Sequence, residues 1–565
     1  SLVDRTGSLD DLIEITTIAE QVRETSLCGL GQTATVPLLE IINNFVDVLE
    51  QEFFEPSTPP QPVNSYVSAP CIEACPSKVD VPKYIDYIRD GKFTHSMGVI
   101  LQKYPMVATC GRVCVRFCEQ ACRRTQIDEA VGIKTLKRFV ADHEREVIND
   151  WFSAYKPAQT ENKNLKVAVI GAGPAGISAA YHLLLKGYHV DMYEKKTVPG
   201  GMAATGIPEY RLPKKILSQE IGIIEKLGGK IHYDKALGRD IEIDSLFTDG
   251  YKAVFLGVGC HKGKSLNIPY EDPALVGYDF GVDFLLRLNR DYIDQGLPMT
   301  MGKKVVVVGG GNVAMDCARS ALRMDGVEEV HLVYRRSEKE MPADHEEIEA
   351  AHDEGVIFHE LTNPTKLIVE EGRLTGVELI RMQLGEIGKS GRRSVSSIDD
   401  SEFILACDNI IPAIGQEVES ASFGSAAGLD FTRWGTLDVT DNLMTSRRGV
   451  FAGGDCVRGP ATLVQAMEQG EKAARSIDDY LSLGRFRFNP DERMAQLVEG
   501  VQPMMSDGVE IPVEHLYRVK VQELDPEIRK KIFEEVEKPI SVDQAYDEAN
   551  RCMRCYRVYS AITER

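Results

Sequence analysis

Residues 165–185 read LKVAVIGAGPAGISAAYHLLL, a short β-branched run followed by three glycines and an apolar stretch. This order predicts a strand, a tight turn and a helix, the opening of a βαβ unit. Gly171, Gly173 and Gly176 form a G-x-G-x-x-G motif, whose glycines let the backbone approach a pyrophosphate at the N-terminus of the helix. Glu194 ends the next predicted strand, about 20 residues on, where a carboxylate accepts hydrogen bonds from a ribose. The stretch predicts a dinucleotide-binding domain, and a glycine turn that only packs helix on strand is the alternative.

A second copy of this strand–turn–helix pattern reads KKVVVVGGGNVAMDCARSAL. Gly309, Gly311 and Ala314 take the three motif positions, so the chain contains an internal duplication of the nucleotide-binding unit. The strand that follows, VHLVY, leads to Arg335 and Arg336, where a site for NAD usually offers an acidic residue. Two guanidinium groups bind a 2′-phosphate through charge-assisted hydrogen bonds, so this loop favours NADPH. A solvated strand end is the alternative for the two arginines.

The composition of the chain is that of a folded protein of several domains, with 565 residues, 43% hydrophobic and 27% charged. Lys and Arg number 65 against 86 Asp and Glu, and the net charge of −21 opposes binding to nucleic acid or an anionic membrane. Residues 167–185 carry no charge, but GAGPAG interrupts them, so we expect a buried unit and no membrane span. With no secretory signal visible and 13 cysteines, we expect metal ligation in the reducing cytoplasm.

Eight of the cysteines fall in tight groups. Four recur every fourth residue in CGRVCVRFCEQAC, two lie upstream in a C-x3-C-P motif, and two lie near the C-terminus in EANRCMRCY. On one helix the first and last of the four would be about 120° apart and could not face one site, which favours two sites. Two [4Fe–4S] clusters require eight thiolates, whereas zinc sites, and a redox-active disulfide for the C-terminal pair, are the alternatives. The eight are Cys71, Cys75, Cys110, Cys114, Cys118, Cys122, Cys552 and Cys555.

The segments GAGPAGISAAYHL and GGMAATGIPEYRLPK resemble the FAD domain shared by the glutamate synthase small subunit, the N-terminal half of dihydropyrimidine dehydrogenase and the large subunit of ferredoxin-dependent transhydrogenases. A second FAD signature of this family is matched by GVFAGGDCVRGPATLVQAMEQGEKAA. The resemblance implies that Asp455 contacts the ribityl or phosphate region and that a helix opening near Thr462 and Leu463 points its N-terminus at the flavin ring. The expected FAD residues are Gly171, Gly173, Pro174, Ala175, Gly176, Glu194, Lys195, Gly201, Met202, Arg211, Gly454, Asp455, Thr462 and Leu463. Those expected for NADPH are Gly309, Gly311, Asn312, Val313, Ala314, Asp316, Arg335 and Arg336, with helix capping as the alternative for Asn312.

The same family usually carries C-x2-C-x4-C-x3-C-P before the CGRVC segment, but only the last two of those four cysteines precede it here. The missing pair matches the C-terminal C-x2-C, so we infer that the tail folds back to complete a cluster. The resemblance implies one cluster on Cys71, Cys122, Cys552 and Cys555, and another on Cys75, Cys114, Cys118 and a fourth ligand. Some relatives use Gln or Glu near the position of Lys137, which an ammonium does not replace, so we expect Cys110 as the fourth ligand.

The N-terminal stretch SLCGLGQTATVPLLEIINNF, with Cys28, resembles the segment that carries the last cluster ligand in the NADH-binding flavoprotein subunit of respiratory complex I. A single cysteine holds no cluster. Either Cys28 ligates a third cluster with partners from another segment or chain, or it is a buried structural thiol.

The sequence therefore predicts an α/β protein with two Rossmann-like three-layer domains, for FAD and NADPH, and an α-helical iron–sulfur domain. The predicted boundaries are 1–55 for the N-terminal helical segment, 56–155 for the iron–sulfur domain, 156–300 with 415–490 for the FAD domain, 301–414 for the NADPH domain and 491–565 for the tail. We expect an oxidoreductase subunit that moves electrons between NADP(H), FAD and [4Fe–4S] clusters in a larger complex, with no catalytic side chain. Other redox subunits, ferredoxin or a complex-I-like flavoprotein are the expected partners. The alternatives are a glutamate synthase small subunit that feeds an amidotransferase, and a non-catalytic scaffold of clusters.

Overall fold

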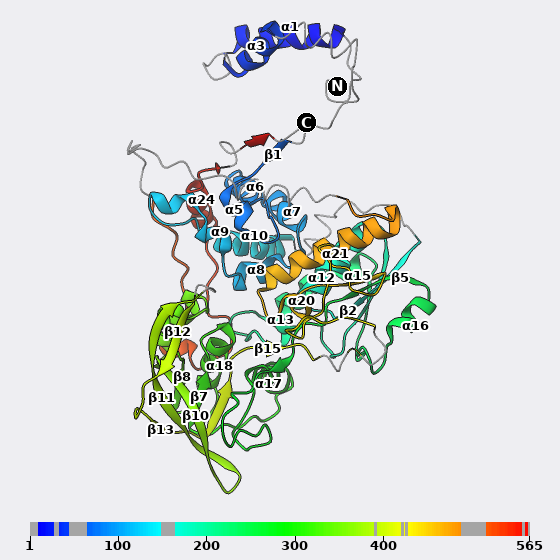
Figure 1. Ribbon diagram of the computed structural model, residues 1–565. Coiled ribbons are helices and arrows are strands. Elements are labelled where there is room, and N and C mark those ends of the chain that lie inside the picture. The colour runs from blue at the N-terminus through cyan, green and yellow to red at the C-terminus, as the bar shows by residue number, and fades with distance from the viewer. Residues whose placement is uncertain are drawn as a thin grey trace. The chain divides into compact units, whose positions relative to one another are not determined.

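The computed structural model describes residues 9–26, 33–44, 65–148, 164–388, 392–419, 423, 428–487, 516–555 and 560–562. They fall into two compact units, Pro70–Met553 and Ser1–Ala69 with Arg554–Arg565. In the smaller unit, α1 (Leu9–Thr25) contacts α3 (Val36–Asn44), and β1 (Ser65–Val67) pairs antiparallel with β17 (Ser560–Ile562). The larger unit contains every element described below (Figure 1).

The larger unit begins with a helical domain. Its helices are α5 (Pro70–Ala74), α6 (Val81–Arg89), α7 (Phe93–Leu101), α8 (Val107–Val113), α9 (Phe117–Gln120) and α10 (Ile133–Ile148). A Cβ atom on Gly111 would lie 2.6 Å from the Cα atom of Arg138, so the backbones of α8 and α10 touch where only glycine fits. The buried residues of these helices share one hydrophobic core with the sheet that follows.

The first nucleotide domain contains a five-stranded parallel sheet of order β16-β5-β2-β3-β4. Its strands are β2 (Lys166–Ile170), β3 (His189–Tyr193), β4 (Lys230–His232), β5 (Tyr251–Leu256) and β16 (Val450–Ala452). Four residues of β2 are buried, as in a parallel strand covered on both faces. Helix α12 (Pro174–Leu185) packs against α21 (Leu463–Leu483), which returns from the far end of the domain (Figure 1). The smaller helices of the domain are α13 (Met202–Thr205), α14 (Lys214–Ile221), α15 (Ile223–Lys226), α16 (Ile243–Thr248) and α20 (Asp455–Arg458).

The second nucleotide domain contains a parallel sheet of order β14-β7-β8-β9. Its strands are β7 (Lys304–Val308), β8 (Glu329–Val333), β9 (Ile357–His359) and β14 (Asn409–Pro412), with helices α17 (Gly281–Arg287), α18 (Asn312–Leu322) and α19 (His345–Glu354). An antiparallel sheet of β10 (Thr362–Glu370), β11 (Arg373–Ile387), β12 (Arg393–Ser397) and β13 (Phe403–Ala406) is inserted before β14. The two connections between the domains pair with each other as β6 (Lys262–Gly263) and β15 (Gln416–Glu417). The predicted fold class, two Rossmann-like domains and a helical domain, is confirmed.

The C-terminal tail of the larger unit returns to the helical domain. Helix α24 (Val542–Asn550) contacts α6 and α10 (Figure 1). Helix α23 (Pro526–Arg529) contacts α19 of the second domain. Among the described helices, none combines the length and apolar character required to cross a membrane.

Candidate functional site

The first glycine loop joins β2 to α12. Gly171 has φ +98°, and a Cβ atom there would lie 2.5 Å from the carbonyl oxygen of Gly257 on the neighbouring strand connection. A Cβ atom on Gly176 would lie 1.9 Å from the carbonyl oxygen of Gly171, so the third glycine lets the helix pack onto the strand. A Cβ atom on Gly173 would have the Cα atom of Gly201 as its nearest neighbour, at 3.7 Å. The middle of the loop is therefore accessible to a bound group.

Glu194 follows β3 at the carboxyl edge of the sheet and is 5% exposed. Its carboxylate accepts hydrogen bonds from the backbone N–H of Ala172 at 2.8 Å and of Lys196 at 3.0 Å. The acidic residue is thus fixed beside the glycine loop.

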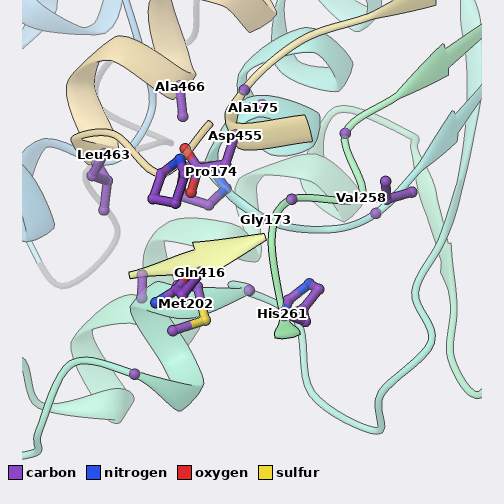
Figure 2. A pocket seen from close by; sticks show the side chains of 18 of the residues that line it. Gly173, Pro174, Ala175, Met202, Val258, His261, Gln416, Asp455, Leu463 and Ala466 are labelled. Carbon is purple, nitrogen blue, oxygen red and sulfur yellow. The ribbon is translucent and has the colours of Figure 1, made fainter. Parts of the chain in front are cut away.

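Helix α21 begins on the other side of this loop. Thr462 caps it in a capping box, with its hydroxyl donating to Oε1 of Gln465 at 2.8 Å. Asp455, at the start of α20, accepts a hydrogen bond from the backbone N–H of Ala461 at 3.3 Å, and burial raises the pKa of this carboxyl to about 6. Pro174, Asp455 and Leu463 of α21 line the same pocket (Figure 2).

These elements line one cavity of about 300 Å³, which we call the central cavity. Most of the predicted cofactor residues line it: Gly171, Gly173, Pro174, Ala175, Glu194, Lys195, Gly201, Met202, Arg211, Asn312, Val313, Asp316, Gly454, Asp455, Thr462 and Leu463. Gly176, Gly309, Gly311, Ala314, Arg335 and Arg336 do not.

Several lining residues were missed by sequence reasoning. His261 reaches the cavity from the connection that contains β6, and burial, reinforced by Lys195 and Lys196, lowers its pKa to about 3, so the imidazole is neutral (Figure 2). Gln416 lines the cavity from β15. Both lie in linkers without a recognised motif, so no signal in the sequence marked them.

The second glycine loop joins β7 to α18. Gly309 has φ +147°, and a Cβ atom there would lie 2.4 Å from the carbonyl oxygen of Ala413. Asn312 does not cap α18, because its Oδ1 accepts a hydrogen bond from the backbone N–H of Asp344 at 2.8 Å. The start of α18 reaches the central cavity, where Asp316 pairs with Arg211 of the first domain at 2.6 Å.

The two predicted phosphate-binding arginines follow β8, outside the central cavity. Arg335 is exposed and has no ion pair among the residues that the structure describes. Nε of Arg336 donates to the carbonyl oxygen of Arg393 at 2.8 Å. The two side chains therefore stand at the carboxyl edge of the second sheet.

The cysteines at positions 110–122 do not lie on one continuous helix, although their four-residue spacing is that of a helix. Helix α8 ends at Val113, and Arg116 adopts a left-handed conformation with φ +62° before α9 begins. Burial raises the pKa of the Cys118 thiol, Lys137 opposes this shift, and the charges of Cys114 and Cys75 add to it, so Cys118 lies near both of these cysteines. Lys137 interacts with all four thiols of this group, Cys75, Cys110, Cys114 and Cys118.

The other cysteines are divided between the two units and the remaining sequence. Cys71, Cys122 and Cys552 pack against the same hydrophobic core of the larger unit. Cys555 belongs to the smaller unit, and Cys28 lies outside the described residues.

The residue before Cys552 anchors this part of the tail. Arg551 is 1% exposed and donates to Oδ1 of Asp128 at 2.9 Å, to Oε1 of Glu548 at 2.6 Å and to the carbonyl oxygen of Glu129 at 2.6 Å. Nη1 of Arg124 donates back to the carbonyl oxygen of Arg551 at 3.2 Å. Cys552 is thus tied to the segment that directly follows Cys122.

No three His, Cys, Asp or Glu side chains within the described ranges are arranged to hold a single metal ion. A [4Fe–4S] cluster binds each thiolate through a different iron, so its ligands lie farther apart than those of one ion. Four thiols, three of them buried and the fourth partly buried, all interact with one lysine and are a donor set of the type and number that such a cluster requires. The group of Cys75, Cys110, Cys114 and Cys118 therefore fits a cluster.

Comparison with known proteins assigns three regions of the chain. Residues 165–470 match the family model of pyridine nucleotide-disulphide oxidoreductases, and residues 65–148 match dihydropyrimidine dehydrogenase domain II, 4Fe-4S cluster. Residues 1–52 match the NADH-ubiquinone oxidoreductase-F iron-sulfur binding region. These matches confirm the resemblances inferred from the sequence and the prediction of a flavin and iron–sulfur oxidoreductase.

Individual relatives agree. The chain is 38% identical to the NADPH-Fe(3+) oxidoreductase subunit beta of Geobacter sulfurreducens, over 98% of this chain and 84% of that protein. It is 39% identical to the NADP(+)-dependent formate dehydrogenase subunit beta of Moorella thermoacetica, over 98% and 85%. Identity to the glutamate synthase [NADPH] small chain of Escherichia coli is 31%, over 73% of this chain and 89% of that one. With this identity over nearly its whole length, the chain belongs to the family of pyridine nucleotide-dependent flavin and iron–sulfur oxidoreductases that contains these beta subunits.

Proposed function

We propose that the chain exchanges a hydride between NADPH and a flavin in the central cavity, and single electrons with two [4Fe–4S] clusters and a partner subunit. The observation that carries the proposal is the convergence of three parts of the chain on this cavity. The glycine loop and α21 of the first domain, the start of α18 of the second domain, and Val113 and Val115 of the helical domain all line it. Because these two valines flank Cys114, a cluster held by that cysteine is close to the flavin.

Different groups around the cavity bind different parts of FAD. The first glycine loop and the N-terminus of α12 bind the pyrophosphate of FAD, and Glu194 accepts hydrogen bonds from its ribose. Asp455 and the start of α21 face the flavin. When bound, FAD takes a hydride from the nicotinamide and passes electrons on singly.

The second domain binds NADPH, with the 2′-phosphate at Arg335 and Arg336. The exposed guanidinium of Arg335, with no carboxylate beside it among the described residues, supports this role, because it is available to a phosphate. The Arg211–Asp316 ion pair holds the start of α18 against the first domain, where the nicotinamide has to meet the flavin.

We assign the clusters by position. Cys75, Cys110, Cys114 and Cys118 hold the cluster next to the flavin, and Cys71, Cys122, Cys552 and Cys555 hold the second. The bonds of Arg551 support the place of Cys552, whereas that of Cys555 rests on the C-x2-C spacing alone. The match of residues 1–52 to an iron–sulfur binding region supports Cys28 as a ligand of a third cluster, completed by other cysteines.

The relatives favour a subunit of an electron-transfer complex over a glutamate synthase subunit. The two beta subunits match 98% of the chain, and the glutamate synthase small chain matches 73%. We propose as partner another redox subunit that exchanges electrons with the cluster distant from the flavin.

The test is anaerobic mixing of the purified chain with NADPH in a stopped-flow spectrometer. We expect bleaching of the flavin absorbance, followed by electron paramagnetic resonance (EPR) signals of reduced clusters. A flavin that stays oxidised would reject the proposal and favour the non-catalytic scaffold. Glutamate formation from glutamine and 2-oxoglutarate by the copurified complex would favour the glutamate synthase alternative.

A further inference from the structure

Lys137 is a buried cation for which the described part of the chain provides no carboxylate partner. It lies on α10, is 4% exposed and donates through Nζ to the hydroxyl of Tyr104 at 2.9 Å. Tyr104 is itself fully buried. Within the described residues, Lys137 forms no ion pair, whereas Lys134, one turn earlier, pairs with Glu346 at 2.8 Å. An uncompensated ammonium in the interior is costly unless a ligand or cofactor supplies negative charge.

The packing of α8 on α10 directs Lys137 toward the cysteines. Gly111 follows Cys110 directly, and the space for a Cβ atom there is filled by the backbone of Arg138, the residue after Lys137. This close approach brings the side chain of Lys137 among the thiols on both sides of Gly111. The thiols of Cys110, Cys114 and Cys118 all interact electrostatically with its ammonium.

We propose that the ammonium of Lys137 raises the reduction potential of the cluster held by Cys75, Cys110, Cys114 and Cys118. When this cluster accepts one electron from the reduced flavin, its net charge becomes one unit more negative. A fixed positive charge in a poorly polarisable interior stabilises that reduced state more than the oxidised state. Net charge near the sulfurs is one of the factors that set cluster potentials. The proposal rests on the ligand set of the proposed function.

In the oxidoreductase, this effect makes the cluster next to the flavin a better electron acceptor. The cation near the second cluster differs from Lys137 because it is already neutralised. Arg124 interacts with Cys122, and its guanidinium is paired with Asp128 at 2.6 Å. Because Lys137 interacts with Cys110, Cys114 and Cys118, we expect it to shift the reduction potential of the first cluster more than that of the second.

The experiment is a redox titration of the full chain, purified anaerobically, with both clusters followed by EPR. Lys137→Met removes the charge and keeps the length of the side chain. We expect the reduced-to-oxidised ratio of one cluster at a fixed potential to fall at least tenfold, which is about 59 mV for a one-electron couple. The control is Lys134→Met on the same helix, because Glu346 keeps Arg116 and Glu537 keeps Arg138 as partners. This control should move neither potential.

The outcomes are distinct. Unchanged or raised potentials in Lys137→Met, with normal iron content, would overturn the proposal but leave the proposed function intact. If Lys137→Met does not assemble the cluster, Lys137→Leu, which is also neutral and cannot ligate iron, is titrated instead, with the same expected fall. If neither neutral variant holds this cluster while both retain FAD and the other one, the lysine acts in assembly and the proposal is rejected. Wild-type protein without the iron of two clusters would refute the ligand assignment itself.

Discussion

Replacement of Arg551 tests whether the tail completes a cluster. Arg551→Met removes a guanidinium that is 1% exposed and bonded to Asp128, Glu548 and the backbone of Glu129. Loss of one partner of a buried ion pair costs about 3–5 kcal/mol. Asp128 keeps Arg124 as a partner, and Glu548 keeps the backbone N–H of Gly132, so we expect a cost near 3 kcal/mol. This energy corresponds to roughly a hundredfold rise in the open population of the tail.

The expected result is the loss of one cluster and nothing else. Cys552 follows Arg551 directly, so a detached tail removes its thiolate from the helical domain. Iron per chain should fall by about four, because one [4Fe–4S] cluster is lost, and one EPR signal should disappear. FAD content should stay constant, because both glycine loops lie elsewhere. The assays are iron, sulfide and flavin determination and EPR on the anaerobically purified full chain.

The matched control is Arg239→Met. Arg239 also pairs with an aspartate, Asp240 at 2.7 Å, but its side chain is 65% exposed. Exposed ion pairs contribute little, so iron and FAD should both remain. If Arg551→Met retained all its iron and both signals, the tail would not supply a cluster ligand. Loss of FAD along with iron would show that Arg551 stabilises the whole unit and would contradict a local anchor.

Three further predictions use other parts of the chain. Neutral replacements of Arg335 and Arg336 should weaken NADPH about tenfold or more and spare NADH, because loss of a charged hydrogen bond costs roughly 1.5–3 kcal/mol; equal losses in equilibrium binding would exclude a phosphate role. The chain should carry one FAD and about eight irons, or about twelve if Cys28 completes a third cluster; a count near four in colorimetric assays would reject two clusters. Burial raises the pKa of Glu220 to about 7, above its usual value, so its contribution to stability is full below about pH 4.5 and is lost as the pH rises through 7. Denaturant unfolding should show that wild type loses stability relative to Glu220→Gln over that range, and a constant difference would contradict the shift.

The nucleotide loops could be predicted from sequence because their determinants are local. Gly176 is required by its contact with Gly171 within one strand–turn–helix unit, Gly171 itself turns with φ +98°, and Glu194 is fixed to that same loop. The capping box of Thr462 and Gln465 likewise involves residues three apart. Such short-range geometry recurs wherever the motif occurs.

The arrangement of the cysteines could not be read in the same way. A spacing of four suggests one helix, but Arg116 breaks it, and its guanidinium pairs with Asp344 and Glu346 of the second domain. The residues around Arg116 in the sequence do not indicate that its partners lie more than 200 residues away, so the break at Arg116 could not be predicted. The role of Lys137 depends equally on Gly111, whose lack of a side chain has meaning only once α8 and α10 are packed.

The tail shows why charged stretches are hard to interpret from sequence. IRKKIFEEVEKP has the composition of a solvated surface segment, yet two of its glutamates pair with arginines of α8 and α10 in the helical domain. Glu535 pairs with Arg112 at 2.6 Å and Glu537 with Arg138 at 2.9 Å. At its other end, Arg529 pairs with Glu354 of the second domain at 3.2 Å. The tail therefore connects the second nucleotide domain to the helical domain through ion pairs whose arginines are buried, in addition to the direct pairs of Arg116 with Asp344 and Glu346. Because removal of one partner leaves a buried arginine without its counter-charge, these pairs resist separation of the tail from either domain and hold the second nucleotide domain close to the helical domain.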